Sequence, residues 1–490
     1  MAEPISIKAL MRESGVAFGT SGARGLVRAM TDRVCFAYTT GFLAHLLQEG
    51  SWKLGDRVAL AGDLRPSTPR ILAACSAAVR RLGGVPVFCG YVPTPALAFH
   101  AIRERIPAVM VTGSHIPDDR NGIKFYRPEG EILKDDEPGI LGQHVAEPEL
   151  DASGALRDAA PLPKPFDVVA PYQARYLDVF GPDALKGRRI GVYQHSAVGR
   201  DIVADILVAV GANVVTLGRS DRFVPVDTEA VRPEDVALAR QWSAEHRLDA
   251  IVSTDGDSDR PLLADENGEW LRGDVLAMLC AKALGMRTVI TPVSSNSVAE
   301  RSGFFDRVER TRIGSPYVIK AMQDALARGE PRVCGYEANG GFLLGSDVER
   351  GGACLATLAT RDAVLPIIAV LADSRSTSVS ALVDGLPKRF THSDRLPDFA
   401  PDRRNELMGW LLEGEDRDAR LDDVFGTIAG GALLRIDLTD GVRMTFGNDR
   451  VIHLRGSGNA PELRCYSEAE TPRLARDIGE QALAIVAEQF

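Results

Sequence analysis

Asp255, Asp257 and Asp259 alternate along a short segment that follows a mostly apolar run over residues 249–253. Three carboxylates this close repel one another, and a hard divalent cation with oxygen ligands relieves the repulsion. A solvated acidic turn is the alternative that involves no ligand. The spacing favours a magnesium or calcium site on a loop that leaves a strand.

An EF-hand calcium loop is the nearest competing motif, because counting from Asp255 places Glu266 at the twelfth position. The sixth position of such a loop is glycine, which makes its sharp turn, but here it is Arg260. The flanking residues 251–252 and 262–264 also have the composition of strands, whereas an EF-hand loop joins two helices. We therefore prefer an oxygen-ligand metal loop between strands.

Ser114 lies in the segment Thr112-Gly-Ser-His-Ile-Pro117, directly after the apolar run 108–111. A serine at the end of a strand can be an acyl nucleophile, a phosphate carrier or a helix cap. The hydrolase elbow G-x-S-x-G is absent, because residue 116 is isoleucine. His115 is adjacent in sequence, a poor position from which to deprotonate Ser114. From these residues alone, the cap and the carrier remain equally open.

Two glycine-rich segments carry groups that bind oxyanions. Residues 18–25 offer backbone N–H groups together with the guanidinium of Arg24. Residues 455–464 offer a hydroxyl and two arginines, Arg455 and Arg464, in a loop after an expected strand. Guanidinium and exposed N–H groups suit phosphate oxygens, although either segment could be an ordinary turn.

A third glycine-rich segment and one lysine complete the candidate set. Within residues 335–341, Glu337 and Asn339 present a carboxylate and an amide, which match the hydroxyl groups of a sugar. Lys124 lies in an expected strand over residues 121–126, where a lone lysine is usually a surface residue. Together, a metal cluster, a serine, two anion-binding segments and a hydroxyl-binding loop indicate an enzyme that acts on a phosphosugar.

Repeated strand–helix–strand units must position these segments. Each unit has a short apolar strand, a helix with apolar residues at helical spacing, a glycine stop and a second strand. Two such units are expected over residues 57–63, 66–82, 85–88, 189–193, 202–210 and 213–217. Units of this kind form right-handed βαβ crossovers in largely parallel sheets.

The rest of the chain contains a third such block and a different C-terminal region. In the third block, Asp274 is expected to cap a helix over residues 275–284, and a strand is expected over 288–291. The C-terminal region has expected strands and a final helix over residues 431–437, 449–454 and 472–489. This last pattern is typical of an α+β domain.

Composition restricts the class of protein. With 490 residues, of which 45% are hydrophobic and 25% charged, the chain has the makeup of a globular protein with several cores. A net charge of −10 argues against nucleic acid or an anionic membrane as a partner. Seven scattered cysteines without a C-x-x-C pair suggest neither disulfides nor zinc, and we expect Cys75 and Cys280 to be buried.

Targeting signals are not apparent in the sequence. The N-terminus lacks a basic region followed by an apolar stretch, so we expect no signal peptide. The longest apolar run, residues 363–372, is too short to span a bilayer. We therefore expect a cytoplasmic protein.

Taken in order, the motifs resemble those of the α-D-phosphohexomutase family, and within it the phosphomannomutase-like branch. The resemblance covers nearly the whole chain. The matching segments are 18–25 (N-terminal signature), 112–117 (phosphoserine loop T-A-S-H-N-P), 255–260 (metal loop D-G-D-x-D-R), 335–341 (sugar-recognition loop G-E-x-S-G) and 455–464 (phosphate-binding loop R-x-S-G-T-E-P). This chain differs from those patterns at Gly113, Ile116, Asn339, Asn459 and Ala460.

The resemblance implies an α/β fold. Three related α/β domains, with mixed and mostly parallel sheets, and a C-terminal α+β domain would surround a central cleft. The expected domains are residues 1–155 with the phosphoserine loop, 160–265 with the metal loop, 266–378 with the sugar-recognition loop and 380–490 with the phosphate-binding loop.

The resemblance also implies roles for individual residues. The catalytic residues would be the phosphoryl carrier Ser114, the candidate general acid/base Lys124, and Arg24, His115 and Arg260. One Mg²⁺ ion per chain would be held by Ser114, Asp255, Asp257 and Asp259. The substrate would be bound by Glu337, Asn339, Arg455, Ser457, Asn459 and Arg464.

The implied reaction is the reversible interconversion of mannose 1-phosphate and mannose 6-phosphate. It would pass through a phosphoserine enzyme and a hexose 1,6-bisphosphate, which is both intermediate and activator. Phosphoglucomutase and phosphoglucosamine mutase are the alternatives within the family. A metal-dependent sugar phosphatase and an inactive sugar-phosphate-binding protein are alternatives from other classes. The expected partner is a phosphohexose, without nucleic acid or membrane, and the chain is expected to be a monomer or a homodimer.

Overall fold

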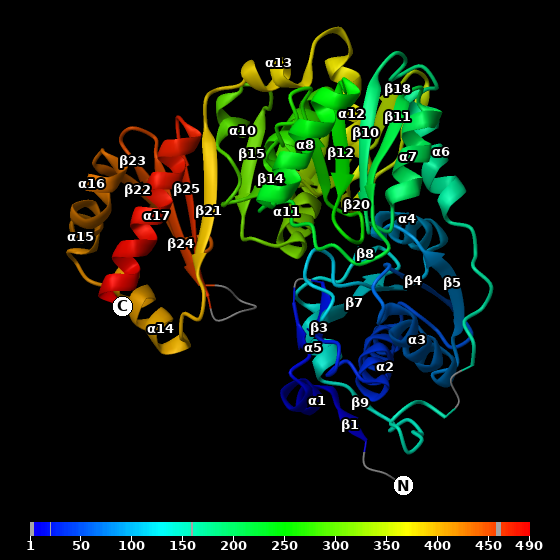
Figure 1. The fold of residues 1–490 in the computed structure, drawn as a ribbon. Helices are drawn as coiled ribbons and strands as arrows, with labels where there is room; N and C mark the ends of the chain where they lie inside the picture. Colours follow the sequence, from blue (N-terminus) through cyan, green and yellow to red (C-terminus); the bar gives the residue numbers. More distant parts are fainter. Residues whose placement is uncertain (1–3, 20, 158–159, 457–461) are drawn as a thin grey trace.

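The computed structural model describes residues 4–19, 21–157, 160–456 and 462–490. It contains four large β-sheets that follow one another along the chain, each with helices packed on it (Figure 1). The first three sheets lie together, and the fourth belongs to a C-terminal lobe at the left of the view. Among the described residues, no helix combines the length and the hydropathy needed to cross a membrane.

The first sheet is mixed and carries helices on both faces. Its strands, in spatial order, are β2 (Ala17–Phe18), β3 (Gly22–Leu26), β7 (Arg120–Arg127), β6 (Ala108–Val111), β4 (Arg57–Gly62) and β5 (Val85–Tyr91). Val58 and Leu60 share a core with the helices α2 (Asp32–Glu49) and α3 (Thr68–Arg81). Ala59 and Ala61 face α4 (Thr94–Glu104) instead, because successive side chains of a strand point to opposite faces.

The second and third sheets follow the same plan. The second has the order β11 (Asn213–Arg219), β10 (Arg189–His195), β12 (Ala250–Thr254) and β13 (Pro261–Ala264), with helices α6 (Val169–Phe180), α7 (Arg200–Ala209) and α8 (Pro233–His246). The third has the order β15 (Arg307–Thr311), β14 (Thr288–Pro292), β16 (Val333–Tyr336), β17 (Phe342–Leu344) and β20 (Leu358–Asp362), with helices α9 (Gly273–Ala283), α10 (Val298–Arg301), α11 (Ser315–Ala327) and α12 (Val364–Asp373).

All three units share one strand connection. In each, a central strand (β4, β10 or β14) pairs in parallel with the next two strands, and the last of these pairs with an antiparallel strand that follows it. The three antiparallel pairs are β6–β7, β12–β13 and β16–β17. The loops inside these pairs contain Ser114, the three aspartates and Glu337, respectively. Three of the predicted functional segments therefore occupy equivalent positions in three repeats.

The fourth sheet is antiparallel throughout. Its order is β21 (Phe390–Leu396), β25 (Leu463–Ala469), β24 (Val451–Gly456), β23 (Val442–Phe446) and β22 (Leu433–Asp437), and its principal helices are α14 (Pro401–Leu412) and α17 (Pro472–Gln489). The predicted fold class is confirmed: three α/β units precede an α+β unit. The exact domain limits given above remain predictions.

Two local predictions have different outcomes. Cys75 and Cys280 are buried, as expected. Asp274 does not cap its helix, because α9 begins at Gly273 after the cap residue Arg272. The Asp274 carboxylate instead accepts hydrogen bonds from the backbone N–H groups of Val275 (2.9 Å) and Asn296 (2.7 Å). Its long-range bond to residue 296 could not be seen in the local pattern.

Candidate functional site

The three aspartates lie in a tight, buried loop between β12 and β13. Asp255 closes the loop, because its Oδ1 accepts from the backbone N–H groups of Asp259 and Arg260, both at 3.2 Å. Carboxylate oxygens of the three aspartates lie within 4.8 Å of one another, and each residue is fully buried. Burial and the two neighbouring carboxylates raise the pKa of Asp255 well above its usual value. The strands on both sides exclude an EF-hand, and Glu266 instead accepts from Ser380 (2.5 Å).

The unsatisfied oxygens of this loop fit a divalent cation. Oδ1 of Asp257 and Oδ1 of Asp259 are buried and have no hydrogen-bond partner among the described residues. A buried carboxylate oxygen without a partner is costly, and a hard cation with oxygen ligands satisfies it. The same loop approaches the first unit closely, since a Cβ on Gly256 would lie 2.6 Å from the carbonyl oxygen of Ser114. Glycine is therefore required there for the two loops to meet.

Ser114 points into the aspartate loop. Its Oγ donates to Oδ2 of Asp255 at 2.6 Å, and its own backbone N–H donates to Oγ1 of Thr112 at 2.8 Å. Ser114 is buried and has a φ of 57°, a left-handed conformation that is rare outside glycine. No helix begins at this residue, so the helix-cap interpretation is wrong. A strained backbone at a buried hydroxyl is typical of a functional residue.

Arg65, which the sequence analysis missed, holds the backbone of the Ser114 loop. Its guanidinium donates to the carbonyl oxygens of Ser114 (2.8 Å), Ile116 (2.6 Å) and Pro117 (3.0 Å), and also pairs with Asp63 (3.0 Å). The side chain is only 1% exposed. A Cβ on residue 113 would lie 2.6 Å from its guanidinium carbon. Glycine at position 113, where the family pattern has alanine, thus leaves space for the Arg65 side chain.

Lys124 is buried inside the site, so the surface interpretation of this lysine is wrong. Its Nζ donates to Oδ2 of Asp257 at 2.5 Å and to Oδ2 of Asp259 at 2.7 Å. Burial alone would lower the pKa of Lys124, but the two aspartates outweigh it and raise the pKa. The ammonium group also helps to lower the pKa of Asp257 against the effect of burial. Lys124 therefore stabilises the ionised form of this carboxylate.

His115 lies beside the hydroxyl of Ser114, and Arg260 and Arg24 add positive charge to this part of the site. Nδ1 of His115 lies 3.3 Å from Ser114 Oγ and accepts from Nη1 of Arg260 at 2.9 Å. Burial, and then Arg260, lower the pKa of His115 well below its usual value, so the ring is neutral. Burial, and then Arg260, also lower the pKa of Arg24 to about 10. These guanidinium groups repel one another, and an anion between them would be stabilised.

The predicted sugar-recognition loop joins the same cluster through Arg361. Glu337 Oε2 accepts from Nη1 of Arg361 (3.0 Å), and Arg361 also contacts Asp259 through Nε (3.1 Å) and Nη2 (3.0 Å). Asn339 Oδ1 accepts from the backbone N–H of Gly341 (2.9 Å), which braces the loop. The Asn339 carbonyl accepts from Thr228 of the second unit (2.8 Å). No local sequence signal identified Arg361, because its partners lie on distant segments.

The predicted phosphate-binding arginines lie on the C-terminal lobe. Arg455 and Arg464 are directly opposite each other on β24 and β25, so they project from the same face of the sheet. Arg455 pairs with Asp440 (2.9 Å) and Arg464 with Glu462 (2.7 Å). Ser457 and Asn459 lie outside the described residues.

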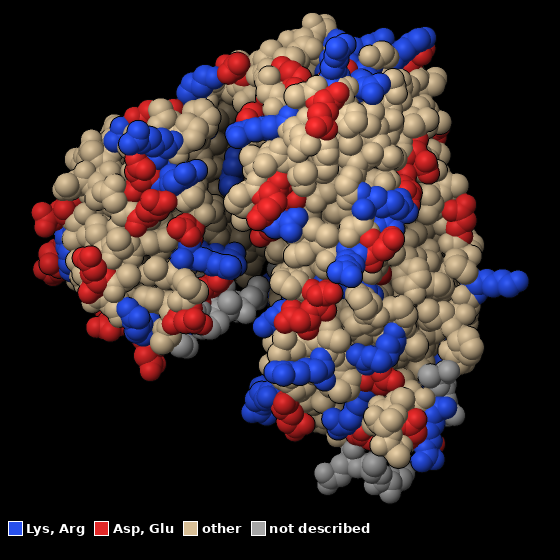
Figure 2. Space-filling view, viewed as in Figure 1, with Lys and Arg blue, Asp and Glu red and all other residues tan. Residues whose placement is uncertain are grey.

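The C-terminal lobe closes one side of a hollow in the molecular surface. Figure 2 shows this hollow between the lobe and the three α/β units, with Lys and Arg side chains along it. Two hydrogen bonds join the lobe to the third unit: the Ile313 N–H donates to Asp440 (3.0 Å), and the Ser297 N–H to Glu468 (3.0 Å). The predicted sites for the two ends of the ligand are thus on different parts of the molecule.

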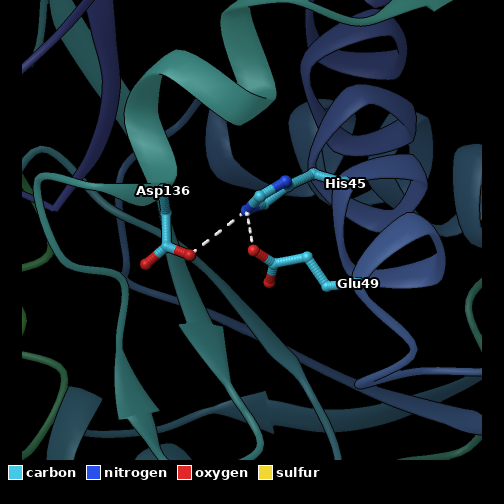
Figure 3. A group of neighbouring side chains, drawn as sticks. All are labelled: His45, Glu49 and Asp136. Atoms are coloured by element: carbon cyan, nitrogen blue, oxygen red, sulfur yellow. Dashed lines mark hydrogen bonds and ion pairs between the residues drawn. The ribbon is translucent and has the colours of Figure 1, made fainter.

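A second cluster of potential metal ligands has another explanation. His45, Glu49 and Asp136 point toward one another between α2 and the helix α5 (Asp136–Leu141), with His45 Nε2 at 3.2 Å from Asp136 (Figure 3). Arg127 pairs with both Glu49 (2.9 Å) and Asp136, and so supplies a positive charge to the two carboxylates. We interpret the cluster as an ion-pair network that joins α5 to α2.

Comparison with known protein families matches three segments of the chain. Models described as phosphoglucomutase/phosphomannomutase α/β/α domains I, II and III match residues 15–149, 172–268 and 272–390. These segments contain the Ser114 loop, the aspartate loop and the Glu337 loop, respectively.

Individual relatives match over almost the whole chain. A phosphomannomutase of Salmonella muenchen is 47% identical and is aligned over 97% of this chain and 96% of the relative. A phosphomannomutase of Sinorhizobium fredii is 45% identical, over 96% of this chain and 99% of the relative. The crystal structure of a phosphoglucomutase/phosphomannomutase family protein from Burkholderia thailandensis has a TM-score of 0.73 at 19% identity, covering 97% of this chain and 98% of that one. The structural likeness supports the fold.

Proposed function

We infer the activity of this chain from its family: it belongs to the phosphoglucomutase/phosphomannomutase family of α-D-phosphohexomutases. It is accordingly an intramolecular phosphotransferase. Within the family we propose that it is a phosphomannomutase, which interconverts mannose 1-phosphate and mannose 6-phosphate. Near-full-length identity of 47% and 45% to two phosphomannomutases supports mannose as the sugar.

One observation carries the chemical proposal: the hydroxyl of Ser114 lies 2.6 Å from Asp255 inside a buried cluster of aspartates and cations. We propose that phosphorylated Ser114 donates its phosphoryl group to a hydroxyl of the bound sugar phosphate. The bond from phosphorus to Ser114 Oγ breaks, and a bond to the sugar oxygen forms. The resulting hexose 1,6-bisphosphate reorients and returns its other phosphoryl group to Ser114.

The surrounding side chains are suited to this transfer. Arg24 and Arg260 would bind the oxygens of the phosphoryl group, where negative charge is spread in the transition state. Lys124 is the candidate general acid/base: as the phosphoryl group leaves, its ammonium would return a proton to Oγ of Ser114 and take up the proton of the attacking hydroxyl. His115 is neutral and accepts from Arg260, so we propose that it orients this guanidinium.

Magnesium fits the aspartate loop, and we propose one ion per chain. Ser114, Asp255, Asp257 and Asp259 would hold it, because two of the aspartates present unsatisfied buried oxygens and Ser114 points at the third. When bound, the ion would neutralise charge on the phosphoryl group. Hexose 1,6-bisphosphate as an activator belongs to the same proposal.

The other end of the substrate would lie against the third unit and the C-terminal lobe. We propose that Glu337 and Asn339 bind sugar hydroxyls. The phosphate that does not react would be bound by Arg455, Ser457, Asn459 and Arg464. We also propose a cytoplasmic location, and a monomer or a homodimer as the active form.

A product assay separates this proposal from its alternatives. The wild-type protein, Mg²⁺ and a trace of hexose 1,6-bisphosphate are mixed with the 1-phosphates of mannose, glucose and glucosamine in turn. We expect mannose 6-phosphate to form with the highest kcat/KM and without release of inorganic phosphate. Stoichiometric inorganic phosphate would instead identify a phosphatase, and a higher kcat/KM for glucose or glucosamine would correct the sugar.

A further inference from the structure

We propose that Arg361 is a positioning residue that couples the metal loop to the sugar-recognition loop. The inference rests on the function proposed above and names a residue for which neither the sequence motifs nor the family resemblance implied a role. Arg361 belongs to neither loop. It lies on β20, which pairs with β17, the strand that follows the sugar-recognition loop.

A single guanidinium contacts both loops. Nε and Nη2 of Arg361 lie 3.1 Å and 3.0 Å from Oδ2 of Asp259, and Nη1 lies 3.0 Å from Oε2 of Glu337. The Arg361 side chain is only 4% exposed, so water competes little for these bonds. Since the guanidinium is planar and rigid, it fixes the position of one carboxylate relative to the other.

The contacts leave a particular oxygen of Asp259 available. Oδ2 of Asp259 is occupied by Arg361 on one side and by Lys124 (2.7 Å) on another. Oδ1 is buried, and within the part of the chain that the structure describes it has no hydrogen-bond partner. A group that binds the outer oxygen of a metal ligand orients the ligand and tunes its affinity for the ion. Arg361 and Lys124 therefore turn Oδ1 of Asp259 toward the position proposed for the metal.

The backbone around Arg361 is itself anchored to the first unit. The preceding residue, Thr360, donates to Oε1 of the buried Glu131 at 2.6 Å, and Ser315 at the start of α11 donates to Oε2 at 2.8 Å. Glu131 comes from the short strand β8 (Gly130–Glu131), which pairs with the Lys124 strand β7. The backbone beside Arg361 is thus tied, through Glu131, to the strand that supplies Lys124.

Gly341 of the sugar-recognition loop lies against the side chain of Arg361. A Cβ on Gly341 would lie 2.5 Å from Cδ of Arg361, so the arginine and the loop backbone are in contact without space for a side chain. A sugar that fixes this loop would therefore also hold Arg361 in place against Asp259. Because the same guanidinium holds Asp259, we infer that occupation of the sugar site and affinity for the metal are linked.

The test compares the full-length wild type with Arg361→Gln and Arg361→Lys. Mg²⁺ affinity is measured by calorimetric titration with and without mannose 6-phosphate, and KM and kcat are measured for mannose 1-phosphate. Loss of a partner that orients a metal ligand typically weakens metal binding by about 10–100-fold, and we expect a loss in that range for Arg361→Gln. Arg361→Lys should be intermediate, since its ammonium keeps the charge but lacks the planar fork that binds Asp259 through two nitrogens while it reaches Glu337.

A merely structural arginine would not affect the coupling between the binding of Mg²⁺ and the binding of the sugar phosphate. In the wild type, mannose 6-phosphate should tighten Mg²⁺, and by linkage Mg²⁺ should tighten the sugar phosphate by the same factor. This factor should approach one in Arg361→Gln. Arg127→Gln is the matched control, because Arg127 also bridges two carboxylates and lies about 10 Å further along β7 than Lys124.

Three results would overturn the inference: unchanged Mg²⁺ affinity and coupling in a folded Arg361→Gln, the same losses in Arg127→Gln, or an Arg361→Lys variant no better than Arg361→Gln. If Arg361→Gln does not fold, as judged by its melting curve, Arg361→Lys carries the test through its weaker Mg²⁺ binding and smaller coupling. The titrations do not depend on turnover. A wild type that binds Mg²⁺ but does not convert mannose 1-phosphate would therefore contradict the proposed function, while the Mg²⁺ titrations still decide the role of Arg361.

Discussion

At the scale of the residue, the proposed chemistry depends on how the Ser114 hydroxyl is oriented. Its left-handed backbone conformation, with a φ of 57°, turns the hydroxyl toward Asp255 rather than along the strand that precedes it. Such a conformation costs free energy and persists because the surroundings determine it. Thr112 and Arg65 supply those surroundings, through hydrogen bonds to the backbone N–H and the carbonyl oxygen of Ser114.

Replacing Ser114 by alanine should remove the phosphoryl carrier. We expect Ser114→Ala to lower kcat for mannose 1-phosphate by on the order of 10⁴-fold or more, the scale at which loss of a nucleophile acts. The control is Ser76→Ala, because Ser76 is also buried, but its hydroxyl lies in α3 and has no hydrogen-bond partner in the described ranges of the chain. Turnover of Ser114→Ala within tenfold of the wild type would refute the phosphoserine assignment.

Local spacing indicated a site where the residues lie near one another in the chain, and gave no signal for side chains whose partners are distant. The alternation of Asp255, Asp257 and Asp259 predicted a metal loop without any structure. A lone lysine in a strand is usually a surface residue, so only the family resemblance implied a role for Lys124; the aspartates that it contacts lie 133 and 135 residues away. Arg65 and Arg361 had no local motif at all.

At the scale of the element, the Ser114 loop is a rigid turn held by one arginine from another segment. Arg65 lies just before α3 and reaches three carbonyl groups of the loop, whose residues are 49 to 52 positions further along the chain. It also stacks on Phe223 of the second unit, with 3.9 Å from its guanidinium carbon to the ring centroid. The loop is therefore positioned from two units at once.

Weakening this clamp should affect catalysis more than folding. Arg65→Lys keeps the charge that Asp63 needs, but it cannot donate to all of the carbonyl groups. We expect kcat to fall by about 10–100-fold, because small misplacements of a reacting group have effects of that size. Arg81→Lys on the exposed end of α3 is the control. A folded Arg65→Lys enzyme with normal kcat would show that the clamp is dispensable.

His453, on strand β24 of the C-terminal lobe, should make the stability of the folded chain sensitive to acid. Burial is the main cause that lowers the pKa of His453 to about 4, and its Nε2 lies 2.5 Å from the carbonyl oxygen of Asp440. As the pH falls from about 6.5, the unfolded chain takes up a proton before the folded one. The contribution of His453 to the free energy of unfolding is thus fully present above about pH 6.5. It is lost as the pH falls toward 4, by up to about 1.4 kcal/mol per pH unit.

The measurement is the thermal midpoint of the wild type and of His453→Gln between pH 7.5 and 5.0. The glutamine amide retains a donor for Asp440 but does not titrate, so the variant should lose less stability on acidification. His144→Gln, at an exposed position, should follow the wild type. Parallel profiles for the wild type and His453→Gln would contradict the assignment.

Individual elements were predictable to different degrees. The strand before the aspartates, the strand before Ser114 and the final helix follow from apolar periodicity, and the last was predicted with its observed limits, residues 472–489. The predicted start of α9 was wrong, because Asp274 bonds to the backbone of residue 296 instead of capping its own helix. A cap is a local signal that a tertiary hydrogen bond can override.

At the scale of the whole molecule, the site exists only where three repeats meet. The first unit supplies Ser114 and Lys124, the second the three aspartates, and the third Arg361 and Glu337. The order of the motifs and the repeated βαβ units were visible in the sequence. That the three loops occupy the same position in each repeat was not, because it depends on an antiparallel strand added at the same point of each sheet.

Magnesium should therefore stabilise the assembly of the three units as well as activate the enzyme. A ligand that binds only the folded state adds about 2.7 kcal/mol at a concentration one hundred times its Kd. We expect Mg²⁺ to raise the melting temperature of the wild type and a chelator to abolish turnover. Asp257→Asn should lose both responses. A wild type whose activity and melting temperature are indifferent to chelator would contradict the metal assignment.

The most direct test of the account follows the phosphoryl group from Ser114. Enzyme carrying ³²P at Ser114 is mixed in excess over unlabelled mannose 1-phosphate with Mg²⁺, and the reaction is stopped within one turnover. We predict that the label leaves the protein and appears in hexose 1,6-bisphosphate and mannose 6-phosphate. Label that stays on the protein, or that appears as inorganic phosphate, would contradict the account.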